Sequence, residues 1–161
     1  MKTLHLLRHA KSDWGDSALP DHDRPLNKRG KRARTTVAEH IAGWKVDRVV
    51  CSTARRARDT AKPVIKALGC PVQYEEALYA ATDKQLLAVV RALPDEAEAV
   101  VLVGHNPSIE ELTALLCGQS PAYPTAALGT VDLVADRWAD VAPGCGTLAA
   151  FVTAAELQAI R

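Results

Sequence analysis

The stretch Leu4-His5-Leu6-Leu7-Arg8-His9-Ala10 lies at the start of the chain and decides how its fold begins. Residues 3–8 are an apolar run typical of a buried strand, and the run ends in an arginine followed by a histidine. Ligands of open α/β folds bind at the carboxyl edge of the strands, so we expect Arg8 and His9 at such an edge. An arginine beside a histidine suits an anion and a nucleophile, and phosphate is the commonest such anion.

Composition limits the classes of protein to consider. A chain of 161 residues, 48% apolar and 24% charged, is typical of one globular domain, and we expect a single domain over residues 1–161. The net charge of +1 gives no overall field that would favour nucleic acid. No apolar run is long enough for a membrane span, and polar residues interrupt the first run as they would not in a signal peptide. We therefore expect a cytoplasmic protein that binds neither nucleic acid nor membrane. The four cysteines lack the spacing of a metal site and are interpreted as reduced thiols.

Strand and helix patterns alternate through residue 117. Further strands are expected at 47–51, 71–74 and 99–103, and helices at 27–42, 54–68, 83–93 and after Pro107. The most apolar strand, 99–103, is expected near the centre of the sheet. Residues 128–134 and 147–152 predict a final antiparallel pair. The pattern indicates an α/β fold, a three-layer α/β/α sandwich whose central sheet is mostly parallel with an antiparallel C-terminal strand.

Helix starts are predicted from capping residues. The expected N-caps are Asn27, Ser52 and Asn106, the last with Pro107 at the first helical position or with Ser108 and Glu111 as an alternative capping box.

Two stretches near the first strand are polar. Residues 10–26 form a long loop rich in turn formers directly after His9, and such a loop is expected to carry substrate contacts. The helix after it begins with the cations Lys28, Arg29, Lys31, Arg32 and Arg34. We interpret most of these as a solvated helix face, with a basic rim that attracts phosphorylated partners as the alternative.

A second histidine and a second arginine complete the expected site. His105 follows strand 99–103 as His9 follows the first strand, so parallel pairing would bring both imidazoles to one sheet edge. Arg56 lies in the first turn of helix 54–68, in line with its buried apolar side chains. Burying a guanidinium group there costs free energy unless it binds an anion. Ser52 and Asn106 stand beside these residues and are expected to contact the same anion or to orient His105.

Three motifs, in order along the chain, resemble the signatures of the histidine phosphatase superfamily. They are Leu6-Leu7-Arg8-His9-Ala10, Ser52-x-x-x-Arg56-x-x-x-Thr60 and Gly104-His105-Asn106-Pro107. The short chain, together with residues 8–12, 25–30 and 77–79, is more similar to the SixA-like phosphohistidine phosphatases. The resemblance runs from Lys2 to beyond Thr125 and implies a phosphoglycerate-mutase-like fold.

The resemblance also implies a mechanism. His9 would be the nucleophile that is transiently phosphorylated, Arg8 and Arg56 would bind the phosphoryl oxygens, and His105 would donate a further hydrogen bond. No metal or cofactor is expected, because the two arginines and His105 supply the positive charge. The substrate would be phosphohistidine on a protein.

One position departs from the family pattern. Many members carry a general acid where this chain has Ala80; Glu75, Glu76 and Asp83 are the candidates to replace it, with a surface carboxylate as the alternative interpretation of each. An alkoxide leaving group benefits strongly from a proton donor, whereas imidazole is a much better leaving group. The missing acid therefore favours phosphohistidine over sugar phosphates.

Three alternatives remain open at this point. The chain would otherwise be a small-molecule phosphomonoesterase of the same superfamily, a non-catalytic module that binds phosphate or a phosphoprotein, or a metal-dependent phosphohydrolase. The last is disfavoured because no carboxylate cluster accompanies the histidines and two arginines would repel a cation.

Overall fold

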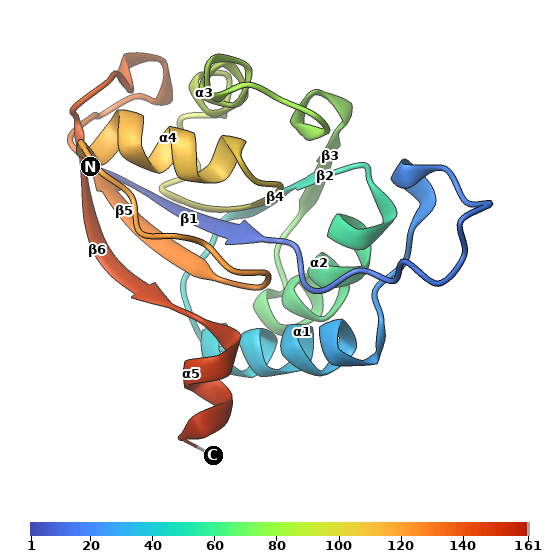
Figure 1. The fold of residues 1–161 in the computed structure, drawn as a ribbon. Helices are drawn as coiled ribbons and strands as arrows, with labels where there is room; N and C mark the ends of the chain where they lie inside the picture. The colour runs from blue at the N-terminus through green and yellow to red at the C-terminus, as the bar shows by residue number, and fades with distance from the viewer. Residues whose placement is uncertain (161) are drawn as a thin grey trace.

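The structure, a computed structural model, describes residues 1–160 and contains one six-stranded sheet (Figure 1). The strands are β1 (Lys2–Arg8), β2 (Arg48–Ser52), β3 (Val72–Glu75), β4 (Ala99–Gly104), β5 (Leu128–Leu133) and β6 (Gly146–Val152). Their order is β3-β2-β4-β1-β5-β6, and the first four run parallel to one another. β5 is antiparallel to both of its neighbours. The mostly parallel sheet with an antiparallel C-terminal pair is confirmed, and β5 is the strand that runs against the others.

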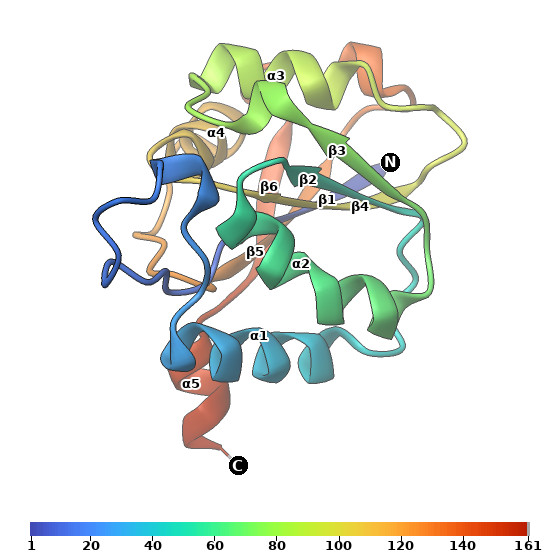
Figure 2. The same cartoon turned by 90° about the vertical axis from the view of Figure 1, so that its right-hand side faces the viewer.

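Helices cover both faces of this sheet (Figures 1 and 2). α3 (Asp83–Arg91) and α4 (Ser108–Cys117) lie on one face, and α1 (Lys28–Ile41), α2 (Arg55–Leu68) and α5 (Ala154–Ala159) lie on the other. Within the described residues there are also three single-turn 3₁₀ helices: η1 (Asp21–Asp23), η2 (Glu76–Leu78) and η3 (Trp138–Asp140). None of the helices within the described residues is long and apolar enough to cross a membrane. The layers are those of the expected three-layer sandwich.

The core has two parts, one on each face of the sheet. β1 contributes to both, since successive side chains of a strand point to opposite faces. Leu4 and Leu6 belong to the cluster that includes α3 and α4, whereas Leu7 belongs to the cluster under α1 and α2. All three leucines are fully buried. β1 is therefore held from both sides, which makes its carboxyl end a rigid place for Arg8 and His9.

Of the three expected N-caps, one is correct. The Asn27 side chain accepts a hydrogen bond from the Gly30 N–H at 2.8 Å. The other two expectations are wrong, because α2 is capped by Ala54 and α4 by Pro107, neither through a side chain. Ser52 is instead the last residue of β2, and Asn106 turns its amide toward Glu110. Both residues stand at strand-to-helix junctions, where partners from distant segments compete with the local cap.

The alternative capping box at Ser108 is also wrong. The Ser108 hydroxyl donates to the His105 carbonyl at 2.9 Å and does not cap α4. The bond closes the turn between β4 and α4, and so helps to hold the backbone of His105.

The loop between β1 and α1 is closed at its base. Ser12 and Leu26 form an isolated antiparallel bridge, and the Asn27 N–H donates to the Lys11 carbonyl at 3.0 Å. Gly30 of α1 packs so tightly here that a Cβ atom would lie 2.1 Å from the Lys11 carbonyl oxygen. The first turn of α1 is thus locked against the backbone that leaves His9.

Candidate active site

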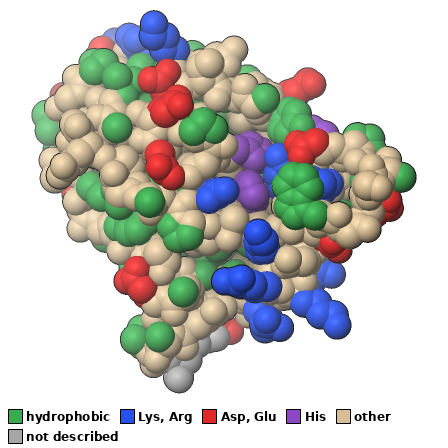
Figure 3. Space-filling model, viewed as in Figure 1, with side chains coloured by type: hydrophobic (Ala, Val, Ile, Leu, Met, Phe, Trp, Pro, Cys, Tyr) green, Lys and Arg blue, Asp and Glu red, His purple; other side chains and the backbone are tan. Residues whose placement is uncertain are grey.

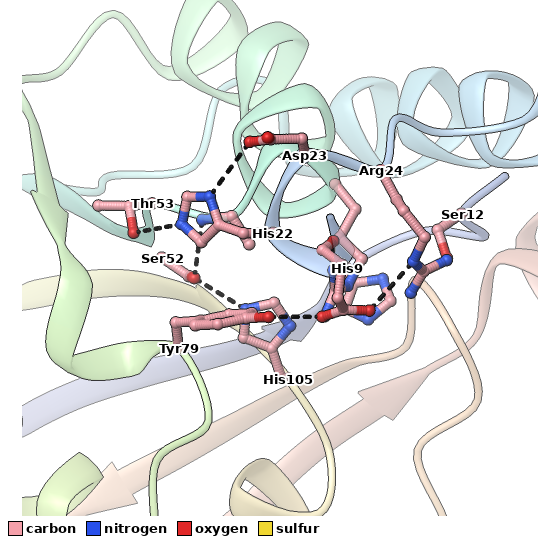
Figure 4. Close-up of polar contacts among 12 residues, drawn as sticks. His9, Ser12, His22, Asp23, Arg24, Ser52, Thr53, Tyr79 and His105 are labelled. Atoms are coloured by element: carbon pink, nitrogen blue, oxygen red, sulfur yellow. Dashed lines mark hydrogen bonds and ion pairs between the residues drawn. The ribbon is translucent and has the colours of Figure 1, made fainter. Parts of the chain in front are cut away.

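His9 and His105 lie side by side at the carboxyl edge of the sheet (Figure 4). Arg8 and Gly104 are register partners of β1 and β4, so the residues that follow them leave the sheet together. The two imidazole centroids are 5.2 Å apart, and the His9 N–H donates to the Gly104 carbonyl at 3.0 Å. His9 is 8% exposed and His105 is 7% exposed. The sheet register alone brings together two residues that are 96 positions apart in the sequence.

One hydrogen bond determines which nitrogen of His9 is free. Nδ1 of His9 lies 2.7 Å from the Ala10 carbonyl oxygen. A carbonyl only accepts, so Nδ1 carries the proton and Nε2 keeps its lone pair. The Ala10 N–H in turn donates to Thr60 Oγ1 at 2.9 Å, and that hydroxyl donates to the Arg56 carbonyl at 2.7 Å. α2 therefore fixes the peptide that orients the His9 ring.

Both imidazoles are neutral at physiological pH. The pKa of His9 is lowered to about 4, chiefly by burial and also by the nearby guanidinium groups of Arg56, Arg8 and Arg24, while the hydrogen bond to Ala10 raises it in part. The pKa of His105 falls to about 3, chiefly through burial and then through His9 and Arg56. A neutral imidazole is the nucleophilic form of histidine, and burial together with the arginines favours that form at His9.

Asp21 of η1 binds two of these arginines, Arg24 and Arg56. Its carboxylate accepts from Arg56 Nη2 at 3.1 Å, from Arg24 Nε at 3.1 Å and from the Tyr79 hydroxyl at 2.6 Å. The Tyr79 hydrogen bond is the largest cause that lowers the pKa of Asp21 to about 2, and the two arginines add to it. Asp21 is therefore ionised and holds Arg56 and Arg24 at the mouth of the site.

Arg24 is a site residue that sequence reasoning missed. It is 6% exposed, donates through Nη1 to Ser12 Oγ at 2.7 Å, and lies 3.4 Å from the ring centroid of Trp14. Asp21 and Arg24 lie in a loop with no periodicity to reveal which side chains turn inward. The sequence features that pointed to this loop were its length and its position directly after His9. They predicted substrate contacts in the loop but not which residues make them.

Ser52 and His22 lie on the other side of the imidazole pair. Ser52 is fully buried, and its hydroxyl lies 2.8 Å from Nε2 of His105 (Figure 4). His22 is half-buried, with 36% of its side chain exposed. Its Nε2 lies 3.0 Å from Thr53 Oγ1, and its ring meets the Tyr79 ring edge-on at 4.9 Å. The reason is that η1 folds back over the end of β2 and carries His22 with it.

Arg8 and Asn106 converge on one backbone carbonyl. Arg8 Nη1 donates to the Tyr123 carbonyl at 2.8 Å, and Asn106 Nδ2 donates to the same oxygen at 3.1 Å. Glu110 accepts from the Asn106 amide and, at 3.1 Å, from the Tyr123 N–H. Arg8 Nε, His105 Nδ1 and Asn106 Oδ1 are the buried side-chain polar atoms in residues 1–160 that have no hydrogen-bond partner. All three belong to the expected site, which therefore retains unused hydrogen-bonding capacity.

The three carboxylates expected as substitutes for an acid at Ala80 do not reach the histidines. Glu75 accepts from Gln73 Nε2 at 2.5 Å and lines a hollow between β3 and α3. Asp83 accepts from the N–H of the next residue, in the first turn of α3. Glu76 is exposed in η2, and within residues 1–160 no hydrogen bond or ion pair joins its side chain to the site. The carboxylate bonded to Arg24, Arg56 and Tyr79 is Asp21, which is ionised and so stores no proton, and Glu110 is bonded to Asn106.

No cluster of three His, Cys, Asp or Glu side chains suited to a metal ion occurs between residues 1 and 160. The polar groups that surround His9 are instead the guanidinium groups of Arg8, Arg24 and Arg56. Such donors bind an anion with three or more oxygens, of which phosphate is the obvious example.

Comparison with known proteins agrees with this geometry. Residues 4–81 match the model of the histidine phosphatase superfamily (branch 1), a span that contains Arg8, His9 and Arg56. An uncharacterized protein of Mycobacterium tuberculosis is 35% identical over 162 aligned positions, which cover 90% of this chain and 98% of that protein.

Two solved structures share nearly the whole architecture. A candidate SixA phosphohistidine phosphatase from Nakamurella multipartitia superposes with a TM-score of 0.81 at 32% identity, covering 94% of this chain and 95% of the other. The protein histidine phosphatase SixA complexed with tungstate superposes with a TM-score of 0.82 at 25% identity, covering 96% and 99%. The fold is therefore the phosphoglycerate-mutase-like α/β fold.

Proposed function

Since this chain belongs to the histidine phosphatase superfamily, we propose that it hydrolyses phosphohistidine on proteins, without a metal, through a phosphorylated His9. The observation that carries the proposal is the bond from His9 Nδ1–H to the Ala10 carbonyl at 2.7 Å, which leaves Nε2 unprotonated among three arginines. The likeness to the SixA structures supports the choice of phosphohistidine.

In the first step Nε2 of His9 attacks phosphorus. The new P–N bond forms as the P–N bond of the substrate breaks, and the electron pair stays on the departing imidazole, which takes a proton from water. Arg8, Arg24 and Arg56 bind the phosphoryl oxygens, and His105 adds a hydrogen bond from its free Nδ1 position in the matching tautomer. Ser52 fixes the His105 ring through the 2.8 Å contact with Nε2. Asn106 helps to hold Arg8 in place through their shared carbonyl partner.

In the second step water attacks the phosphorus of phosphorylated His9. The P–Nε2 bond breaks, its electron pair returns to the ring, and inorganic phosphate leaves, while a proton of the attacking water passes to solvent and balances the proton taken up in the first step. The positive charge of the arginines offsets the negative charge of the attacked group in both steps, so the chemistry depends on positioning and electrostatics.

The leaving group decides between phosphohistidine and an alkyl phosphate. Asp21 is ionised and His105 is neutral, with pKa values of about 2 and about 3. The pKa of the Tyr79 hydroxyl is raised by its hydrogen bond to Asp21, so it is a weak acid. None of these groups donates a proton readily at neutral pH, which penalises an alkoxide far more than an imidazole.

A substrate panel tests the proposal. A phosphohistidine protein, phosphoramidate, an aryl phosphate and a sugar phosphate are compared, each with and without EDTA. We expect the phosphohistidine protein to be hydrolysed fastest, EDTA to have no effect, and acid-labile phosphate to be trapped on the wild type but not on His9→Ala. Equal turnover of the sugar phosphate would instead identify a small-molecule phosphomonoesterase. Binding without turnover would identify a non-catalytic module.

A further inference from the structure

Five exposed cations lie together beside the site and define what we term the basic patch. They are Lys11, Lys28, Arg29, Lys31 and Arg32. Within residues 1–160 none of the five makes an ion pair or a side-chain hydrogen bond, whereas nearby Arg34 donates to the Asp59 carbonyl at 2.7 Å. Figure 3 shows Lys and Arg side chains gathered next to the histidines, over the start of α1. Because the whole chain has a net charge of +1, this concentration of charge is local.

The basic patch opposes the electrostatics of the helix that carries most of it. The amino end of a helix is positive and is stabilised by acidic residues, yet the first turn of α1 contains none. Lys28 repels Lys31 and Arg32, which stand three and four residues further on. These repulsions destabilise α1, so the cations do not serve the stability of the helix. Binding of an external anion explains their presence better.

The position of the basic patch relative to His9 is fixed. Lys11 follows His9 by two residues, and its carbonyl accepts from the Asn27 N–H at 3.0 Å. The close approach of Gly30 to the same carbonyl holds α1 against this segment. An anion bound to the patch would therefore lie at a set distance from the phosphoryl group on His9.

Two hollows lead away from the site through the basic patch. A cavity of about 130 Å³ is lined by Lys11, Arg29, Thr125, Thr153 and Gln158, among others. Thr125 directly precedes Ala126, whose N–H donates to the His9 carbonyl at 3.0 Å, so the cavity adjoins the site. A groove of about 480 Å³ continues past Gln158 and is lined by Lys31 and Arg32. Among residues 1–160 no aromatic side chain lines either hollow, which disfavours a nucleic acid that would stack its bases there.

We propose that the basic patch binds an acidic surface next to the phosphohistidine of the protein substrate, with one carboxylate in the cavity between Lys11 and Arg29. This inference rests on the proposed function and specifies the kind of protein that the enzyme takes. The five cations extend over the first two turns of α1 and the adjoining loop, which is broader than a small phosphorylated metabolite and suits a protein surface. Opposite charge in this arrangement accelerates encounter and fixes orientation.

Two synthetic peptides test the inference. Both carry one phosphohistidine, flanked by Asp and Glu in one peptide and by Asn and Gln in the other. We expect the wild-type kcat/KM to be about tenfold higher for the acidic peptide at low salt, and the preference to shrink at high salt. The double variant Arg29→Glu and Arg32→Glu should lose the preference and still hydrolyse phosphoramidate at the wild-type rate.

A matched control carries the same charge change elsewhere. Lys66→Glu with Lys84→Glu, on exposed positions of α2 and α3, should keep the preference. Four outcomes would each overturn the docking inference. Two concern the preference itself: equal rates on both peptides, or loss of the preference in both variants. The other two are slowed phosphoramidate hydrolysis in the patch variant and stronger competition by a polynucleotide than by the acidic peptide. Failure of the wild type to hydrolyse either peptide would instead remove the proposed function, and the inference with it.

Discussion

The protonation state of His9 is the most direct test of the reasoning about the site. With a pKa of about 4 in place of 6.5, His9 would be only about 9% protonated at pH 5, whereas an ordinary histidine would be about 97% protonated. The first cause of this difference is burial, because the low-dielectric surroundings disfavour the imidazolium ion. The bond to the Ala10 carbonyl further predicts that the neutral ring carries its proton on Nδ1.

Nuclear magnetic resonance of the protein labelled with ¹⁵N-histidine measures both properties. Long-range ¹H–¹⁵N spectra recorded from pH 4 to pH 8 distinguish the Nδ1–H tautomer, the Nε2–H tautomer and the imidazolium ion, and the His9→Gln variant assigns the signals. We expect the Nδ1–H form of His9 to persist down to pH 5. Replacing one neighbouring cation, in Arg56→Gln, should raise the pKa of His9, since that guanidinium lowers it.

A distant arginine provides the control for that variant. Arg91→Gln removes a charge from α3, on the opposite face of the sheet, and should leave the His9 titration unchanged. A midpoint near 6.5 would refute the argument from burial and positive charge. An Nε2–H tautomer would refute the assignment of Nε2 as the nucleophile.

Three further predictions concern the framework of the site. Thr60→Val should cost about 1–3 kcal/mol of folding free energy and lower kcat, because it leaves the buried N–H of Ala10 unpaired. Gly30→Ala should destabilise by about 1–3 kcal/mol and lower kcat, because its Cβ would lie 2.1 Å from the Lys11 carbonyl oxygen. The folded-state pKa of buried His5 is about 4, so the unfolded state binds more protons and the free energy of unfolding falls as the pH drops below 6.5. By pH 5 this loss is about 2 kcal/mol. The His5→Gln variant should lack this part of the pH dependence.

Urea unfolding and steady-state kinetics check these three predictions. Thr60→Ser keeps the hydroxyl and should retain both stability and kcat, so an equal loss in the serine variant would contradict the role of the hydrogen bond. Gly144 has a positive φ with open space around it, so Gly144→Ala should lose less folding free energy than Gly30→Ala and leave kcat unchanged. An unchanged pH dependence of unfolding in His5→Gln would show that other groups account for the acid sensitivity.

Much of the architecture follows from patterns that are local in the sequence. The apolar runs at 3–8 and 99–103 and the helical stripes between them were sufficient to predict the strands, the layers and the central place of β4. Arg8, His9 and His105 could be proposed as neighbours because parallel strands bring their carboxyl ends to one edge. Such inferences succeed because the period of a strand or helix is a property of consecutive residues.

The capping predictions show where local reasoning ends. Ser52 and Asn106 are good capping residues by type, yet their side chains contact His105 and the Tyr123 carbonyl, which come from distant segments. Asp21 and Arg24 gave no periodic signal, since an irregular loop turns particular side chains inward only when it packs against the rest of the fold.

The sequence by itself determined which residue types stand at the ends of the strands, because a short apolar run and the polar residues after it are adjacent in the chain. Only the tertiary structure decided how those residues are used. The tautomer of His9, the neutrality of both imidazoles and the grouping of three arginines around His9, two of them bound by Asp21, depend on burial and on contacts between distant segments. These quantities arise from the surroundings that the folded chain creates, and no pattern of neighbouring residues specifies them.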